Sequence, residues 1–147
     1  MELADGRVMM WIRCNGGSQF KSFSEDGGDT WTPAVPAHEF PSTEAPLSMK
    51  RDPVTGRLAA IWCDRDPRWH ITPSKGTWER TPLAIAWSDN EAHSWHGHRL
   101  LENDPNAGFC YTAILFTKDA LLLAYCCGHL PHVPLQDLRI RRVPRPL

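Results

Sequence analysis

An octapeptide at residues 24–31 constrains the fold of this chain more than any other feature, because each fixed position suits a tight turn between two strands. The pattern is Ser-x-Asp-x-Gly-x-Thr-Trp, and its fixed positions are Ser24, Asp26, Gly28, Thr30 and Trp31. The Asp26 carboxylate can accept hydrogen bonds from backbone N–H groups of the turn, and glycine supplies a positive φ at no steric cost. The two hydroxyls can cap leftover backbone groups, and the tryptophan can pack beneath the turn as an apolar anchor.

A second, degenerate copy of the octapeptide occupies residues 88–95. Ser88 and Trp95 hold its first and last fixed positions. One such octapeptide can arise by chance, but two copies, separated by room for several strands, predict a repeat protein.

Turn signals and apolar runs predict strands around the two octapeptides. Three turns each lead into a mostly apolar run of strand length, at residues 7–14, 57–63 and 120–126. These runs lack clean alternation, which is typical of strands buried on both faces. Further strands are expected at residues 20–24, 83–88 and 138–143, the last with a polar face. The stretches rich in Pro, Gly and His are expected to be long connections, at residues 32–46, 64–82 and 128–136.

Composition excludes several classes of function. The net charge of −1 favours neither nucleic acid nor an anionic membrane surface, and no apolar window reaches the length of a membrane span. Met1 is followed by Glu2 and Asp5, which is unlike a secretory signal, so a cytoplasmic location is expected. The five cysteines form no CxxC pair and are interpreted as small buried hydrophobes in a reducing compartment: Cys14, Cys63, Cys110, Cys126 and Cys127.

The two octapeptides resemble the Asp-box, or bacterial neuraminidase repeat, of the sialidases (neuraminidases), whose fold is a six-bladed β-propeller. In that family the box joins the third and fourth strands of a blade, away from the active site. The resemblance implies an all-β fold, a partial propeller of about two and a half four-stranded antiparallel blades, forming one incomplete domain over residues 1–147. Such a fragment has two open flanks. It is therefore either the C-terminal portion of a larger protein that lacks its N-terminal blades, or a chain that self-associates.

The resemblance extends to candidate site residues. Sialidases contain a segment of the type Glu-x-x-x-x-Glu-Leu-x-Asp-Gly-Arg-x-x-x-x-x-Arg, in which the first Glu assists the nucleophile and the last Arg binds the substrate carboxylate. Residues 2–13 match its later part, so Arg13 is the candidate carboxylate ligand and the assisting Glu would lie upstream of Met1. Arg80, which precedes the strand into the second box, fits a second carboxylate ligand. Tyr111, after that box and a short strand, fits the nucleophile. The first-blade Arg and the Asp general acid of the family have no counterpart.

The chemistry accounts for these residue types. Sialic acid carries a carboxylate on its anomeric carbon, which guanidinium groups bind well. That carboxylate would repel an anionic nucleophile, whereas a neutral Tyr deprotonated by a nearby Glu avoids the clash. The resemblance thus implies a sialidase-like exo-glycosidase, or the C-terminal part of one, that is inactive as an isolated monomer. The alternatives are a non-catalytic carbohydrate-binding or scaffolding module, and a truncated product that only associates with itself or a partner.

Structural interpretations compete with each of these assignments. Arg13 could cap a strand end, Arg80 could lie in solvent, and Tyr111 could be a buried aromatic of the sheet. Glu44, Asp64 and Asp66 lie near strand ends, but nothing in the sequence singles them out.

Two weaker signals point elsewhere. Two histidine pairs lack a partner set for zinc, and the arginines near the C-terminus alternate with apolar residues as on an edge strand. We therefore expect no metal, no other cofactor and no nucleic-acid partner. The histidines are His96, His98, His129 and His132, and the arginines are Arg139, Arg141, Arg142 and Arg145.

Overall fold

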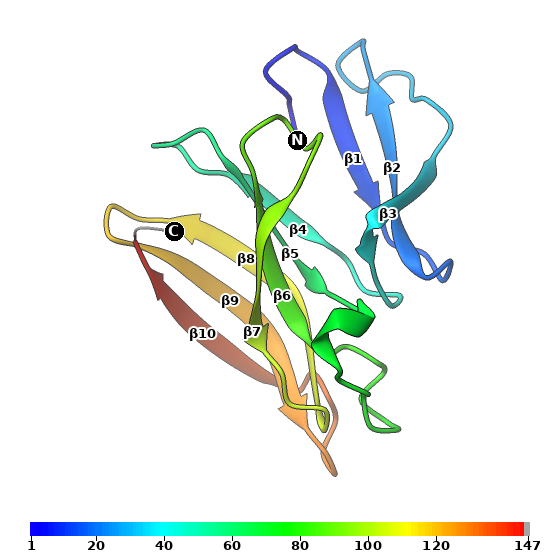
Figure 1. Ribbon diagram of the computed structural model, residues 1–147, viewed down its shortest axis with the longest axis vertical. Coiled ribbons are helices and arrows are strands. Elements are labelled where there is room, and N and C mark those ends of the chain that lie inside the picture. Colours follow the sequence, from blue (N-terminus) through cyan, green and yellow to red (C-terminus); the bar gives the residue numbers. More distant parts are fainter. Residues whose placement is uncertain (146–147) are drawn as a thin grey trace.

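The computed structural model describes residues 1–145, which form three antiparallel sheets (Figure 1). The last two residues of the expected domain, 146–147, lie outside the described part. The first sheet comprises β1 (Val8–Ile12), β2 (Ser18–Ser24) and β3 (Val35–Pro41). The central sheet comprises β4 (Ser48–Arg51), β5 (Leu58–Cys63), β6 (Leu83–Ser88) and β7 (His96–Glu102). The third sheet comprises β8 (Ala107–Phe116), β9 (Ala120–His129) and β10 (Asp137–Pro144). The predicted all-β class is confirmed.

Helical structure within residues 1–145 is restricted to one 3-10 turn, η1 (Pro67–Trp69). No helix in this part of the chain has the length and apolar character needed to span a membrane. All six strands expected from the sequence are present, although their ends differ by a few residues.

Two of the expected connections were wrong. The stretch 32–46 contains β3, whose two prolines, Pro36 and Pro41, resemble loop residues in sequence. Proline is tolerated here because β3 is an edge strand of its sheet, so a missing N–H costs no hydrogen bond on the open side. The stretch 128–136 begins inside β9, which extends to His129.

The central sheet is buried on both faces, as the unbroken apolar runs predicted. Along β5, Ile61 and Cys63 join the core shared with the third sheet, whereas Ala60 and Trp62 join the core shared with the first sheet. Residues of β6 divide in the same way. Since side chains alternate along a strand, each of these strands supplies both cores at once, which explains why neither shows polar alternation.

The core between the first and central sheets is built around Phe40. Its ring meets those of Trp11, Trp62 and Trp95 edge to face, at centroid distances of 4.8, 4.7 and 5.0 Å. Each such pair adds about 0.5–1.5 kcal/mol beyond the area it buries. The Trp of the second octapeptide thus anchors two sheets together.

Two of the three arginines of β10, Arg139 and Arg141, turn toward the central sheet, contrary to the expected polar outer face, although both side chains remain partly exposed. Arg139 and Arg141 donate to the Glu102 carboxylate of the central sheet at 2.8 and 3.1 Å. Leu138 and Ile140, which alternate with them, are 69% and 71% exposed. Arg139 and Arg141 lie on this side of the strand because the Glu102 carboxylate accepts their hydrogen bonds.

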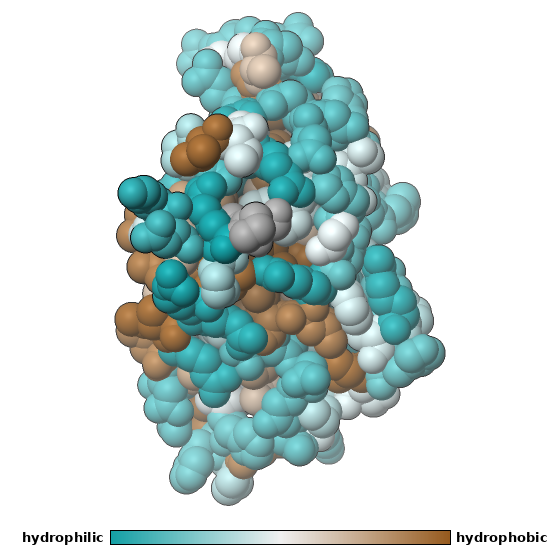
Figure 2. Space-filling view, turned by 60° about the vertical axis from the view of Figure 1, so that its left-hand side comes forward, coloured by the Kyte–Doolittle hydropathy of each residue, from teal (hydrophilic) through white to brown (hydrophobic). Residues whose placement is uncertain are grey.

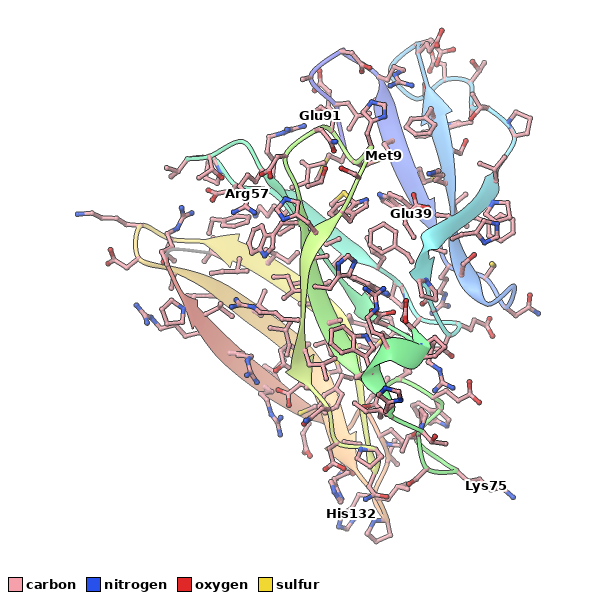
Figure 3. All side chains as sticks on the ribbon, in the orientation of Figure 1. Met9, Glu39, Arg57, Lys75, Glu91 and His132 are labelled. Carbon is pink, nitrogen blue, oxygen red and sulfur yellow. The ribbon has the colours of Figure 1, made fainter. Side chains whose placement is uncertain are left out.

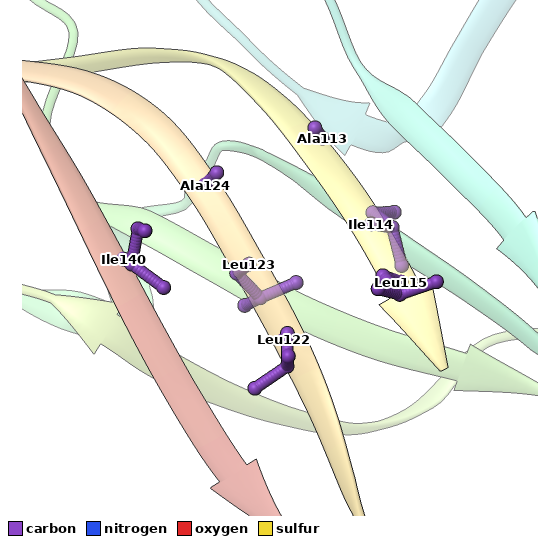
Figure 4. Close-up of a pocket in the computed structure, with 7 residues that line it drawn as sticks. All are labelled: Ala113, Ile114, Leu115, Leu122, Leu123, Ala124 and Ile140. Atoms are coloured by element: carbon purple, nitrogen blue, oxygen red, sulfur yellow. The ribbon is translucent and has the colours of Figure 1, made fainter. Parts of the chain in front are cut away.

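The outward side of the third sheet therefore carries an apolar surface. A shallow hollow on it is shown in Figure 4, and its lining residues are Ala113, Ile114, Leu115, Leu122, Leu123, Ala124 and Ile140. Viewed from the side on which this sheet lies, the surface shows hydrophobic patches among hydrophilic residues (Figure 2). We call this side the open face of the third sheet.

Candidate functional site

A polar pocket of about 420 Å³ lies where connections from the first and central sheets meet. Its lining residues are Arg13, Thr43, Glu44, Trp78, Glu79 and Arg80. They come from the segments that follow β1, β3 and β5. Because antiparallel strands alternate in direction, these three segments emerge at the same end of the sheets.

The two octapeptides lie at the opposite end. They join β2 to β3 and β6 to β7, so the second one connects the third and fourth strands of the central sheet. In Figure 3, Glu91 of the second octapeptide is at the top of the view, and Lys75 of the β5–β6 connection is at the bottom. Turn and pocket are thus separated by the length of the strands.

Arg80 and Tyr111, predicted from separate parts of the sequence, are in contact. The Arg80 guanidinium carbon lies 5.3 Å from the centroid of the Tyr111 ring. Hydrogen bonding from Arg80, and then from Arg13, lowers the pKa of the Tyr111 phenol because both cations favour the phenolate. The structure therefore brings all three candidate residues together, with the arginines lining the pocket and the tyrosine beside it.

The backbone at Tyr111 departs from a regular strand. Pairing of β8 with β9 is regular up to Cys110 and resumes at Ala113, with a bulge between them. Within it Tyr111 has a φ of 58°, in the left-handed region that a tyrosine seldom adopts. A bulge changes the direction in which a side chain points. Tyr111 is 50% exposed, so it is not a buried aromatic of the sheet.

Arg80 is half-buried, in contrast to an arginine that simply lies in solvent. Its Nη1 atom is buried and has no hydrogen-bond partner among the described residues. A buried guanidinium N–H without a partner is costly, and an anionic ligand would satisfy it. Arg13, by contrast, is exposed at the end of β1.

Three carboxylates near strand ends have different surroundings. Glu44 lines the pocket and is exposed. Asp64 is buried, accepts from the Trp69 indole at 2.7 Å, and has a raised pKa because burial disfavours its charge. Asp66 caps η1 by accepting from the Arg68 N–H at 2.9 Å. Four residues that line the pocket were not singled out from the sequence: Thr43, Glu44, Trp78 and Glu79.

The first octapeptide forms the turn that its sequence predicts. The Ser24 hydroxyl accepts from the Gly28 N–H at 2.8 Å, and the Asp26 carboxylate accepts from the Thr30 N–H at 2.9 Å. Hydrogen bonds from the Thr30 hydroxyl and N–H, and from Ser24, hold the pKa of Asp26 well below its ordinary value. The Trp31 indole donates to the Gly28 carbonyl at 2.9 Å but remains 38% exposed, so this Trp is not a buried anchor.

The second octapeptide repeats these hydrogen bonds with different residues. Ala92 N–H donates to the Ser88 hydroxyl at 3.0 Å, and Ser94 N–H donates to the Asn90 amide oxygen at 2.9 Å. Glu91 and Ala92 hold φ values of 57° and 65°, where the first octapeptide has two glycines. The turn thus survives the loss of both glycines and of the aspartate.

Other candidate residues lie apart from the pocket. All five cysteines are free thiols, and three of them are buried. Within residues 1–145 no group of His, Cys, Asp and Glu has the arrangement of a metal site. Arg145, the last described residue, donates to the buried Asp52 at 2.8 Å and so holds the turn between β4 and β5.

Comparison with known structures shows the fold of the chain. The leech intramolecular trans-sialidase, in complex with 2,7-anhydro-Neu5Ac, is 17% identical, with a TM-score of 0.68 over 97% of this chain and 22% of that one. The Ruminococcus gnavus intramolecular trans-sialidase, in complex with oseltamivir carboxylate, is 18% identical, with a TM-score of 0.64 over 96% of this chain and 31% of that one. A Dyadobacter fermentans protein of unknown function is 17% identical, with a TM-score of 0.55 over 98% of this chain and 36% of that one.

The chain therefore spans about a fifth to a third of the length of these structures. No curated protein matches it significantly in sequence. The model of the BNR repeat-like domain family matches residues 1–123, which confirms the relationship inferred from the two octapeptides. The chain is similar in fold to part of the two intramolecular trans-sialidases, and it belongs to the BNR repeat-like domain family.

Proposed function

We propose that this chain supplies part of a sialidase-like glycosidase site, in which Arg13 and Arg80 bind a sugar carboxylate and Tyr111 is the nucleophile. The observation that carries the proposal is the convergence of these residues: Arg13 and Arg80 line one pocket, and the Arg80 guanidinium carbon lies 5.3 Å from the centroid of the Tyr111 ring. The two trans-sialidases similar in fold have an anhydro-sialic acid and oseltamivir carboxylate bound. In this proposal the three sheets are blades of an incomplete propeller, about two and a half blades in all.

In the proposed reaction, the Tyr111 oxygen forms a bond to the anomeric carbon of the sugar. The phenol gives its proton to a base, its oxygen bonds to the anomeric carbon, and the glycosidic carbon–oxygen bond breaks. The leaving oxygen takes a proton from a general acid, and water later releases the sugar and regenerates the phenol. The sequence predicts that the base, the acid and a third arginine come from outside this chain, so the isolated monomer is expected to bind sugar without turnover.

Binding and turnover test the proposal separately. The full chain should bind N-acetylneuraminic acid. Arg80→Lys should weaken that binding, because an ammonium group cannot make the bidentate hydrogen bonds of a guanidinium group. The control variant Arg68→Ala should leave the binding unchanged. Arg68 lies in the same β5–β6 connection and pairs with Asp66 outside the pocket. Binding that is unaffected by Arg13→Ala and Arg80→Lys would overturn the proposal. Sialoside hydrolysis by a monomer, abolished by Tyr111→Phe, would contradict the inactivity of the isolated chain.

A non-catalytic carbohydrate-binding module is the second candidate. The observation that favours it is the surroundings of Tyr111: in the described part of the chain, the groups that shift the pKa of its phenol are the guanidinium groups of Arg80 and Arg13 and the Cys110 thiol, with no carboxylate among them. In such a module Tyr111→Phe would leave binding unchanged, and addition of the missing blades would produce no hydrolysis.

A further inference from the structure

The pocket contains a turn of unusual sequence, Thr77-Trp78-Glu79-Arg80. The Arg80 N–H donates to the Thr77 carbonyl at 3.2 Å, and the two central residues, Trp78 and Glu79, have φ values of 54° and 56°. Turns with positive φ at both central positions are dominated by Gly, Asn and Asp, because other side chains crowd the backbone there. A tryptophan followed by a glutamate is therefore a disfavoured choice at this place.

The surrounding structure holds the turn in this shape. Thr77 is completely buried, and its hydroxyl donates to the Ser74 carbonyl at 2.8 Å. The Phe109 N–H of β8 donates to the Arg80 carbonyl at 2.7 Å. A side chain at Gly108 would lie 3.1 Å from the Thr77 carbonyl, so β8 packs closely under the turn. The backbone strain at Trp78 and Glu79 is thus imposed by contacts on both sides.

The strained turn displays Trp78 at the pocket rather than burying it. Its side chain is 53% exposed, although tryptophan rings in proteins are mostly buried. The ring lies beside the cationic centre of the pocket, 5.8 Å from the Arg80 guanidinium carbon. Glu44 and Glu79 line the same pocket with carboxylates. The pocket therefore offers two cations, an apolar ring and two acceptors.

Strain of this kind is retained where a function requires it, since Gly or Asn at position 78 would give the same turn without the steric cost. We propose that Trp78 is a platform for the C–H face of a pyranose ring whose carboxylate is bound by Arg13 and Arg80. An anionic pyranose satisfies all three groups: guanidinium for carboxylate, indole for the C–H face, and carboxylates for hydroxyl groups. This inference rests on the proposed function and specifies the ligand as a sugar acid in ring form.

Two ligands distinguish a platform from a residue that merely supports Arg80. N-acetylneuraminic acid has both the carboxylate and the ring, whereas lactate has the carboxylate without the ring. Saturation-transfer NMR and titration calorimetry on the full chain would measure both. We expect Trp78→Ala to weaken binding of the sugar about tenfold, equal to about 1.4 kcal/mol, and to leave lactate binding unchanged. Trp78→Phe should restore most of the sugar binding, because a flat apolar ring remains.

Trp31→Ala is the matched control, since it removes another exposed tryptophan, in the first octapeptide, at the end of the sheets opposite the pocket. It should preserve binding of the sugar acid to within about twofold. Equal loss of sugar and lactate binding in Trp78→Ala would overturn the platform and leave Trp78 as a support for Arg80. Unchanged sugar binding in Trp78→Ala would also overturn it. If the unmodified chain and Arg80→Lys bind neither ligand, the proposed function itself fails, and the inference fails with it.

Discussion

The Arg51 guanidinium binds the Glu91 carboxylate through two hydrogen bonds, of 2.6 and 2.8 Å. Glu91 stands in the second octapeptide where the first has Gly27, and both residues have positive φ. The same carboxylate accepts from the Ala4 N–H at 2.7 Å. A side chain at the strained position thus ties the N-terminal segment and the central sheet to one turn.

This relationship predicts effects of different size for two substitutions at position 91. Glu91→Gln keeps the strain and loses the charge, so it should lower the free energy of unfolding by about 1 kcal/mol. Glu91→Gly should be close to neutral, because relief of the left-handed conformation, about 1 kcal/mol, offsets the lost contacts. Urea unfolding of both variants measures the change in the free energy of unfolding. A Glu91→Gly variant that is much less stable than Glu91→Gln would contradict this prediction.

The Asp-box aspartate predicts a dependence of stability on pH. Hydrogen bonds lower the folded pKa of Asp26, so its contribution is fully present above the unfolded pKa, about 3.9, and is lost as the pH falls through the lower folded value. Asp26→Ala should therefore lower Tm at pH 7 more than at strongly acidic pH. Asp26→Asn should lower it less, because Asn90 forms the corresponding bond in the second octapeptide. Thermal unfolding across pH measures both effects.

The sequence was most informative where local chemistry determines structure. The turn at residues 24–31 follows from side chains that bond to their own backbone, and the apolar runs correctly indicated the two inner strands of the central sheet, β5 and β6. The strand β3 was not predicted, because its prolines resemble loop residues and the burial of its Phe40 depends on a neighbouring sheet.

The candidate site was only partly predictable for a similar reason. Order along the chain was enough to select Arg13, Arg80 and Tyr111. Glu44 and Trp78 had no such signal, because they reach the pocket through the packing of connections from different sheets. Two consecutive positive φ values at Trp78 and Glu79 could not be foreseen, since Trp-Glu is not a typical turn dipeptide and the contacts that impose it are remote in sequence.

The two tyrosines of the chain should titrate in separate steps. Hydrogen bonding from Arg80 lowers the pKa of Tyr111, whereas burial, and then the hydrogen bond to the Glu102 carboxylate, raises the pKa of Tyr125. Ultraviolet absorbance followed against pH should show one phenol below its ordinary pKa of about 10 and one above it. Tyr111→Phe should remove the first step, and Arg80→Met should move it upward. A single step for both phenols would contradict the contact between Arg80 and Tyr111.

The open face of the third sheet predicts association, either with a second copy of the chain or with further blades. Ile140 and Leu115, exposed by 71% and 55%, border the hollow of Figure 4, and such apolar surface favours contact with another sheet. Ile140→Glu should therefore reduce the mass measured by light scattering, with little change in Tm because the side chain is already exposed. Val54→Glu, in the turn between β4 and β5 and outside the lining of the hollow, is the control, because Val54 is 74% exposed; it should not change the mass. A monomeric unmodified chain would exclude self-association and leave further blades as the partner of this face.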